Sequence, residues 1–409
     1  MYSLAIYLYM FCVNVVALFN KKARLLMRGH RNIYPILRAN IRPDERYIWF
    51  HAASLGEFEQ GRPLMEMIRK EHPEYKILLT FFSPSGYEVR KNYEGADVIC
   101  YLPFDTALNA RKFVRLARPE MAFFIKYEFW QNYLTVLYKK NIPAYSVSSI
   151  FRPNQIFFRK YARPYAHVLK CFAHFFVQNQ QSYDLLTRHG IKNVTVVGDT
   201  RFDRVIQIRE NAHPLPVVEA FAQSVPDGGQ MVVAGSSWPA DEDILIDYFN
   251  QHSNQWLVLA PHVVSEDHLQ DIERKLKRPC IRYSQATTMN VAAAECLIID
   301  GYGLLSSIYR YGQVAYVGGG FGVGIHNVPE AAVYGLPVVI GPNNKHFLEA
   351  QALLKLGGCF EIQDEASYAL LMEHLASDRA FLQEAGQKAG AYINENAGAA
   401  EKVFKAVAL

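Results

Sequence analysis

The stretch YIWFHAASLGEFEQGRPLMEMI, residues 47–68, places a strand, a turn and a helix in direct succession. The apolar run 47–53 suits a buried strand, and apolar residues recur at helical spacing after Gly56. Between the two lie the small residues Ser54 and Gly56, followed by the carboxylate of Glu57 in the first turn of the expected helix. A strand that runs directly into a helix is typical of βαβ units, whose ligands bind at the carboxyl ends of the strands. The stretch therefore predicts a parallel α/β sheet with a candidate site at Ser54, Gly56 and Glu57.

Short apolar runs alternate with amphipathic stretches along the rest of the chain, which is the pattern of repeated βαβ units. The predicted strands are 47–53, 76–82, 97–103, 121–127, 142–149, 174–179 and 194–199 in the first half, and 231–237, 255–261, 280–284, 296–300, 314–319 and 336–342 in the second. This order predicts two doubly wound, Rossmann-like domains with a ligand-binding cleft between them.

The length of 409 residues also favours two domains, because single cores rarely grow beyond about 250–300 residues. We expect an N-terminal anchor over 1–20, a first domain over 21–210, a proline-bearing linker over 211–230 and a second domain over 231–409. The last helix of the chain could instead pack against the first domain.

The first 19 residues are apolar and almost uncharged, and five basic residues follow them closely: Lys21, Lys22, Arg24, Arg28 and Arg31. This arrangement predicts a membrane anchor with the remaining chain on the cytoplasmic side. The apolar stretch just reaches the length of about 20 residues that a spanning helix needs, and its tyrosines also suit a helix lying at the membrane surface. A buried first helix of the globular domain is the alternative.

Charge is divided unevenly between the two halves. Residues 1–210 hold 31 Lys and Arg against 17 Asp and Glu, whereas residues 211–409 hold 12 against 22. A basic half points to an anionic partner such as phosphorylated lipid, a membrane surface or nucleic acid, or else to a solvated surface without a partner. The six cysteines have no metal-binding spacing, so we expect reduced core thiols and no metal site.

Two glycine-bearing loops of the second half are candidate nucleotide sites. AGSSWPADEDIL, residues 234–245, places Gly235, Ser236 and Ser237 between a strand and a helix, where backbone N–H groups bind phosphate or form an ordinary capped turn. VGGGFGVGIHNVPEAAVYGLPVVIGP, residues 317–342, combines five glycines, Gly320 among them, with Asn327 and Glu330 at the next helix start. Glu330 suits the hydroxyls of a ribose, or serves only to complement the helix dipole. The glycine spacing does not match the dinucleotide fingerprint, so no dinucleotide cofactor is expected.

In chain order, the N-terminal apolar segment and the motifs HAASLGE, FFSPSGYE, KYEFWQNYL, VGDTRFD, GSSWPADE, APH and GGGFGVGIHNVPEAA resemble the 3-deoxy-D-manno-octulosonic acid (Kdo) transferases of lipopolysaccharide synthesis. The resemblance covers nearly the whole chain. It implies a glycosyltransferase of the two-Rossmann GT-B architecture that uses no metal or other cofactor. The implied reaction moves Kdo from CMP-Kdo, with inversion, onto a tetraacylated bis-phosphorylated lipid A precursor (lipid IVA) at the cytoplasmic face of the bacterial inner membrane. Inner-membrane lipids are therefore implied partners.

The resemblance also implies roles for individual residues. Glu57 corresponds to the general base of the family, for which the alternative is a helix cap, and Ser54, Gly56 and Glu128 lie on the acceptor side. The donor side comprises Gly235, Ser236, Ser237, Gly320, Asn327 and Glu330, together with His262 and Arg201.

The sequence departs from the family at three of its motif positions. Lys126 stands where an acid is common, so no role of that acid carries over. His262 stands where arginine is common and would bind an anion as a cation only when protonated. Arg201 replaces a usual lysine, and we expect a donor-side or hinge cation, or a surface salt bridge.

Three other functions compete with this interpretation. The first is another GT-B glycosyltransferase or an epimerase that acts on a UDP-sugar. The second is a scaffold that binds anionic lipid without catalysis, against which the intact SLGE and HNVPE motifs argue. The third, binding of nucleic acid, is not expected because no nucleic-acid-binding motif is recognisable.

Overall fold

The structure is a computed structural model that describes residues 2–159 and 163–407. The chain divides into two compact units. The N-terminal unit comprises Met1–Arg204 and Ala397–Leu409, and the C-terminal unit comprises Val205–Asn396.

The described part of the N-terminal unit contains one seven-stranded parallel sheet with the order β3-β2-β1-β4-β5-β6-β7. Its strands are β1 (Arg46–Ala52), β2 (Tyr75–Phe81), β3 (Val98–Tyr101), β4 (Pro119–Ile125), β5 (Ala144–Ser149), β6 (His174–Val177) and β7 (Val194–Val196). Every apolar run that the sequence predicts as a strand in this half contains one. Because β1 pairs with both β2 and β4, the strand order reverses at β1, which is the position where doubly wound sheets bind ligands.

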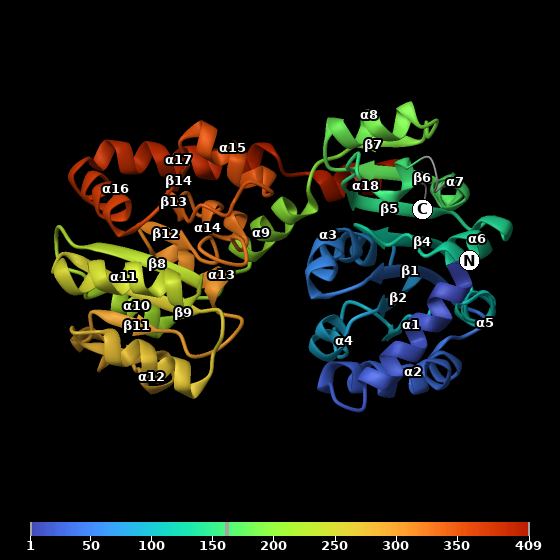
Figure 1. Cartoon of the computed structure of the whole chain (residues 1–409), viewed down its shortest axis with the longest axis horizontal. Helices are drawn as coiled ribbons and strands as arrows, with labels where there is room; N and C mark the ends of the chain where they lie inside the picture. The colour runs from blue at the N-terminus through green and yellow to red at the C-terminus, as the bar shows by residue number, and fades with distance from the viewer. Residues whose placement is uncertain (1, 160–162, 408–409) are drawn as a thin grey trace. The chain divides into compact units, whose positions relative to one another are not determined.

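Helices cover both faces of this sheet (Figure 1). They are α1 (Tyr2–Val16), α2 (Lys21–Asn40), α3 (Leu55–Glu71), α4 (Pro84–Arg90), α5 (Ala107–Ala117), α6 (Gln131–Lys139), α7 (Arg163–Ala166), α8 (Gln180–Arg188) and α18 (Ala399–Ala406). Helix α9 (Thr200–Glu210) begins in the N-terminal unit and ends in the C-terminal unit. Successive residues of β1 point to opposite faces: Trp49 packs with α2, α5 and α6, whereas Phe50 packs with α3 and α18.

The C-terminal helix α18 packs within the N-terminal unit. The carboxylate of Asp203 accepts hydrogen bonds from the backbone N–H groups of Gly398 (2.6 Å) and Ala400 (3.1 Å) at the start of that helix. Ala399, Ala400 and Val403 are buried in the core beside α3. Both ends of the chain therefore contribute helices to the same unit.

The described part of the C-terminal unit contains a second seven-stranded parallel sheet, of order β10-β11-β9-β8-β12-β13-β14. Its strands are β8 (Gln230–Ser237), β9 (Gln255–Pro261), β10 (Cys280–Arg282), β11 (Cys296–Ile298), β12 (Val314–Val317), β13 (Val338–Ile340) and β14 (Cys359–Glu361). Its helices are α10 (Pro216–Gln223), α11 (Pro239–Gln251), α12 (Glu266–Lys275), α13 (Leu305–Ile308), α14 (Val328–Ala332), α15 (Leu348–Leu356), α16 (Glu365–Ser377) and α17 (Arg379–Glu395). The sequence did not predict β14, and the segment expected to be a linker contains α10, whose Val218 and Phe221 are buried.

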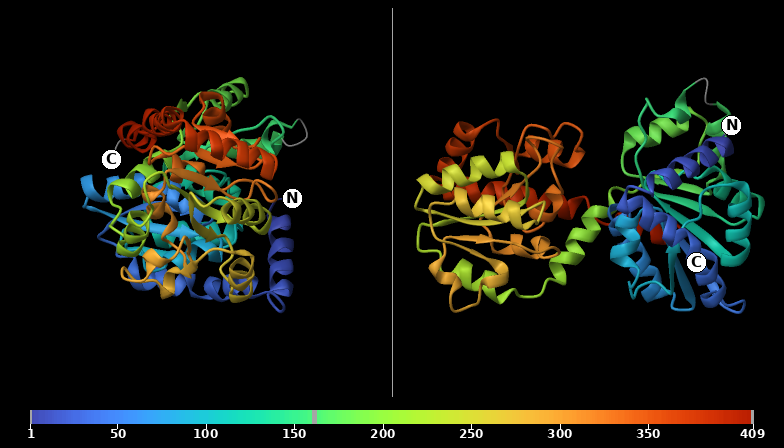
Figure 2. Two further views of the ribbon diagram at one scale, coloured as in Figure 1. Left: turned by 90° about the vertical axis from the view of Figure 1, so that its left-hand side faces the viewer. Right: turned by 60° about the horizontal axis from the view of Figure 1, so that its bottom comes forward.

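Helix α1 lies along the N-terminal unit (Figure 2). Ile6, Met10 and Val13 face the core, whereas Leu8 and Phe11 are 63% and 66% exposed. Within residues 2–159 and 163–407 no single helix is long and apolar enough to cross a membrane; α1 and α2 satisfy that requirement only as a pair, and the chain bends by 119° between them.

All six cysteines are free thiols, as expected from their spacing. Cys100, Cys171, Cys296 and Cys359 are buried. Cys12 is exposed on α1, so the expectation of core thiols does not hold for every cysteine.

Candidate active site

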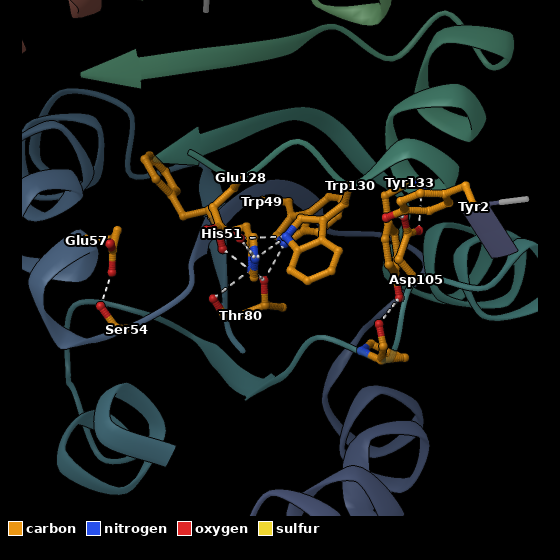
Figure 3. Close-up of polar contacts among 12 residues, drawn as sticks. Tyr2, Trp49, His51, Ser54, Glu57, Thr80, Asp105, Glu128, Trp130 and Tyr133 are labelled. Atoms are coloured by element: carbon orange, nitrogen blue, oxygen red, sulfur yellow. Dashed lines mark hydrogen bonds and ion pairs between the residues drawn. The ribbon is translucent and has the colours of Figure 1, made fainter. Parts of the chain in front are cut away.

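Glu57 lies in the first turn of α3, directly after β1 (Figure 3). Ser54 is the N-cap residue, and its hydroxyl donates a hydrogen bond to the Glu57 carboxylate. Gly56, between them, is exposed, and a side chain there would approach only the Ser54 hydroxyl. The three residues predicted from the sequence therefore form one open turn at the carboxyl edge of the sheet.

The spacing of Ser54 and Glu57 matches a capping box, in which each side chain bonds the backbone of the other residue. In the structure the two side chains bond one another, and Ser54 makes no side-chain bond to the helix backbone. A carboxylate at this position is also stabilised by the positive end of the helix dipole. The turn thus holds a carboxylate, partly open to solvent, close to the first N–H groups of α3.

A second polar cluster lies at the same edge of the sheet (Figure 3). His51, on β1, is fully buried, and its Nδ1 lies 2.9 Å from Thr80 Oγ1 and 3.2 Å from the Thr80 carbonyl oxygen. Its Nε2 lies 3.1 Å from Glu128 Oε2, and the indole Nε1 of Trp130 lies 2.6 Å from the same oxygen and 3.0 Å from the imidazole. The sequence analysis singled out Glu128 but missed His51, although it belongs to the quoted HAASLGE motif.

The hydrogen-bond partners define where the protons lie in this cluster. The Thr80 carbonyl can only accept, so Nδ1 of His51 carries a hydrogen. The Trp130 indole can only donate, so it leaves Nε2 and Glu128 Oε2 as neighbouring acceptors. The indole N–H thus lies within hydrogen-bond distance of both acceptors, so His51, Glu128 and Trp130 form one hydrogen-bonded cluster.

The backbone just after β4 has an unusual conformation. Lys126 has φ 65°, in the left-handed region that few residues other than glycine occupy. Its amide donates to the Val147 carbonyl at 2.8 Å. This conformation precedes Glu128 by two residues and helps to orient it toward β1.

The predicted donor residues other than Arg201 lie at the end of β8 or in the segments that follow β9 and β12 in the C-terminal unit. Gly235 lies under Tyr309, whose hydroxyl would collide with any side chain at this position, and Ser236 has φ 53°. Ser237 is buried and donates to Glu242 at 2.9 Å. The Ser237 hydroxyl is therefore already bonded, and the backbone N–H groups are what this turn can offer to a phosphate.

Asn327 and Glu330 form a polar pair at the start of α14. Asn327 Nδ2 donates to Glu330 Oε1 at 2.7 Å, and Ser306 donates to Oε2 at 3.3 Å. Gly320 packs so tightly against Gly341 that a side chain there would collide with its backbone. The glycine at 320 is thus required by the packing of two loops, irrespective of any ligand.

His262 is exposed and lies in a stack of three rings. Its ring is 4.8 Å from Trp238, nearly parallel to it, and 4.5 Å from His326, another residue that the sequence analysis did not single out. Trp238 Nε1 donates to His326 Nε2 at 3.1 Å. Burial, and secondarily the proximity of His262, lowers the pKa of His326 below its usual range.

Arg201 lies at the start of α9, in the N-terminal unit. Its guanidinium pairs with Asp199 at 2.6 Å, and its amide donates to the same carboxylate at 2.9 Å. This is the ion pair that the sequence analysis considered as the alternative to a donor-side role. Within residues 2–159 and 163–407, His, Cys, Asp and Glu side chains form no group of three or more that could hold a metal ion.

Solved structures with similar architecture define the fold class. The UDP-GlcNAc 2-epimerase of Neisseria meningitidis bound to UDP-GlcNAc aligns with a TM-score of 0.63, 11% identity and coverage of 88% of this chain and 98% of that one. The calicheamicin glycosyltransferase CalG4 aligns with a TM-score of 0.54, 13% identity and coverage of 89% and 98%. The chain therefore has two parallel-sheet α/β domains of the kind found in GT-B glycosyltransferases and these epimerases.

The matches in sequence point to a narrower class of protein than the fold does. The family model for 3-deoxy-D-manno-octulosonic-acid transferase (kdotransferase) matches residues 27–204. The 3-deoxy-D-manno-octulosonic acid transferase of Aquifex aeolicus is 25% identical over 344 residues, covering 81% of this chain and 86% of that protein. The transferase of the same name from Haemophilus influenzae is 23% identical over 376 residues, covering 88% and 86%. The chain resembles the Kdo transferases, and the resemblance extends through both units.

Proposed function

We propose that this protein is an inverting glycosyltransferase that transfers Kdo from CMP-Kdo to a lipid A precursor, lipid IVA. The observation that carries the proposal is the Glu57 turn. A partly exposed carboxylate lies at the carboxyl edge of the sheet, within residues 27–204 that match the Kdo transferase family model, and the resemblance of its SLGE motif to that family implies a general base.

The chemistry assigns a proton transfer to this carboxylate. Glu57 accepts the proton of an acceptor hydroxyl while the hydroxyl oxygen attacks the anomeric carbon of Kdo. CMP leaves with the electron pair of the broken bond, on the opposite face, so the configuration inverts. The reaction as written needs no metal, because a phosphate leaving group can be stabilised by preorganised N–H dipoles and cations.

The C-terminal unit supplies groups suited to CMP. The turn Gly235–Ser237 offers backbone N–H groups to the phosphate, and the Glu330 carboxylate offers an acceptor to ribose hydroxyls. His262, which is exposed and contacts the rings of Trp238 and His326, can bind an anionic group when it is protonated.

The proposed location is the cytoplasmic face of the bacterial inner membrane. Helix α1 has 15 residues, below the roughly 20 that a spanning helix needs, and presents exposed Leu8 and Phe11 beside a strongly basic α2. An apolar face next to basic residues suits a helix that lies in the interface of an anionic membrane. The basic N-terminal half likewise suits a bis-phosphorylated acceptor.

The test is transfer by the purified full-length chain in detergent, with CMP-Kdo and lipid IVA as substrates. We expect a product whose mass rises by whole Kdo residues, and their number follows from the same spectrum. UDP-GlcNAc and other UDP-sugars serve as control donors. Consumption of a UDP-sugar without Kdo transfer would favour an epimerase or another GT-B transferase, and binding of anionic lipid without any turnover would favour a scaffold.

A further inference from the structure

A cavity of about 310 Å³ adjoins the His51–Glu128 pair in the N-terminal unit. Glu128 and Trp130 form part of its wall, and Gln155, Phe157 and Tyr165 contribute from the segment that follows β5. Tyr2, from the beginning of α1, is also part of the wall. The cavity therefore joins the predicted acceptor side to the N-terminal helix.

The wall of this cavity is aromatic and polar, with no aliphatic side chain among its lining residues. Aromatic rings offer flat apolar faces, and the phenol and indole groups add hydrogen-bonding capacity at their edges. A volume of about 310 Å³ is at the lower end of the range of ligand pockets, about 300–1,000 Å³. These properties suit a single sugar ring, whose C–H faces stack on aromatic rings and whose hydroxyls need hydrogen-bond partners, better than several acyl chains.

Two polar groups on the wall are available to such hydroxyls. Glu128 uses Oε2 for Trp130 and His51, while Oε1 makes no hydrogen bond within the described part of the chain. Gln155 accepts a bond from the Arg152 amide at 3.1 Å through Oε1, and its Nε2 donates to no described residue. The cavity thus offers one acceptor, Glu128 Oε1, and one donor, Gln155 Nε2.

Tyr2, at the start of α1, is held in the cavity wall by a hydrogen bond to Asp105 (Figure 3). The Tyr2 hydroxyl donates to Asp105 Oδ2 at 2.7 Å, and its ring stacks on Tyr165 with a centroid separation of 5.8 Å. Asp105 is only 1% exposed and also accepts the backbone N–H groups of Asn132 and Tyr133 at the start of α6. A buried carboxylate with three hydrogen bonds holds Tyr2 in one place, so the beginning of α1 forms a fixed part of the wall.

We propose that this cavity is the subsite for a sugar ring of the acceptor and that the N-terminal helix completes it through Tyr2. The proposal deepens the function proposed above and rests on it. The helix has one face toward the cavity and core and another exposed apolar face, so an acceptor with a sugar headgroup and acyl chains meets both on one helix. Removal of α1 from its position would take away part of the sugar-binding wall as well as an apolar surface.

The test compares the variants Tyr2→Ala and Gln155→Ala with Tyr138→Ala, a matched tyrosine control that is exposed on α6 and does not line the cavity. Two quantities are measured in detergent: the KM for each substrate in Kdo transfer, and the affinity for a deacylated glucosamine disaccharide bisphosphate by calorimetry. We expect Tyr2→Ala and Gln155→Ala to raise the acceptor KM and weaken disaccharide binding about tenfold, the scale of one lost ring contact or hydrogen bond. The KM for CMP-Kdo in all variants, and the acceptor KM and disaccharide affinity of Tyr138→Ala, should change by less than about twofold, as for an exposed surface substitution.

Each outcome decides one of the two proposals. Unchanged acceptor KM and disaccharide affinity in folded Gln155→Ala overturn the sugar subsite, and this variant keeps the test valid if Tyr2→Ala does not fold. If the wild type binds the disaccharide but transfers no Kdo, and Gln155→Ala loses that binding, the subsite is supported and the proposed transferase function fails. If the wild type transfers Kdo and Tyr138→Ala loses acceptor affinity as strongly as Tyr2→Ala does, the specific role of Tyr2 is overturned.

Discussion

Replacement of Glu57 by glutamine distinguishes between two roles of this residue, a catalytic base and a helix cap. Glutamine has the same size and can still accept the Ser54 hydroxyl, but it cannot take a proton at neutral pH. Loss of a general base lowers kcat by about 10²–10⁴-fold, which is about 3–5 kcal/mol of activation free energy. The Glu57 side chain is partly exposed and its observed bond is to Ser54, so the free energy of unfolding should fall by no more than about 1 kcal/mol. A cap alone would give the opposite pattern, an effect on stability with kcat retained.

The assay is the initial rate of Kdo transfer at saturating concentrations of both substrates, alongside urea unfolding. Ser54→Ala is the matched control, because it removes the hydroxyl that bonds Glu57 and keeps the carboxylate. We expect its kcat to fall by less than about tenfold, as for loss of one orienting hydrogen bond. A Glu57→Gln protein that retains kcat within about threefold of wild type, below the smallest effect of a general base, would refute the reasoning and move the search for the base to Glu128.

Three further predictions concern stability and pH. Asp105→Ala removes the acceptor of three hydrogen bonds from a buried site, and we expect a loss of about 3–5 kcal/mol in urea unfolding, against a smaller loss for Asp105→Asn. Burial lowers the pKa of His30 to about 4. The unfolded state therefore binds a proton that the folded state excludes, so stability should fall by up to about 3 kcal/mol as pH drops from about 6.5 to 4, and His30→Phe should remove most of that slope. Affinity for CMP-Kdo should weaken as pH rises from about 6 to 8 in the wild type and become independent of pH in His262→Arg, measured by calorimetry.

Contrary results are specific to each case. Asp105→Ala with wild-type stability would mean that α1 and α6 do not depend on this carboxylate. Equal pH slopes for the wild type and His30→Phe would assign the acid sensitivity to other groups. A donor affinity that is constant across this pH range in the wild type would exclude His262 as a titrating contact to the donor.

The elements that the sequence predicted correctly are those whose signal lies in neighbouring residues. The run before Ser54 forms β1 and the segment after it forms α3, because a buried strand flanked by small turn residues and an amphipathic helix is encoded by neighbouring residues. Strand β14 was not predicted; it has three residues, of which only Cys359 is buried, so it has no run of apolar core residues that would mark it as a strand. Helix α10 was hidden by its prolines, one of which occupies the first helical turn, where proline is tolerated.

The sequence predicted mainly those parts of the candidate site whose residues are neighbours in the chain. Ser54, Gly56 and Glu57 are adjacent in sequence, and so are Gly235, Ser236 and Ser237. His51 and Glu128 are 77 positions apart, and Tyr2 and Asp105 are 103 positions apart. No periodicity in the sequence relates such pairs, so His51 and Tyr2 had no signal of their own.

By itself, the sequence determined two parallel α/β domains and a carboxylate at the end of the first strand, because strand, turn and helix preferences act over a few neighbouring residues. Tertiary structure decided the partners of the polar groups. The order β2-β1-β4 brings Thr80, His51 and Glu128 to one edge of the sheet. The packing of α1 against the core decided that an apolar N-terminus contributes Tyr2 to a cavity wall, and the return of α18 decided that the N-terminal unit contains both ends of the chain. The physical reason is that these contacts depend on strand order and helix packing, which bring together residues far apart in the chain.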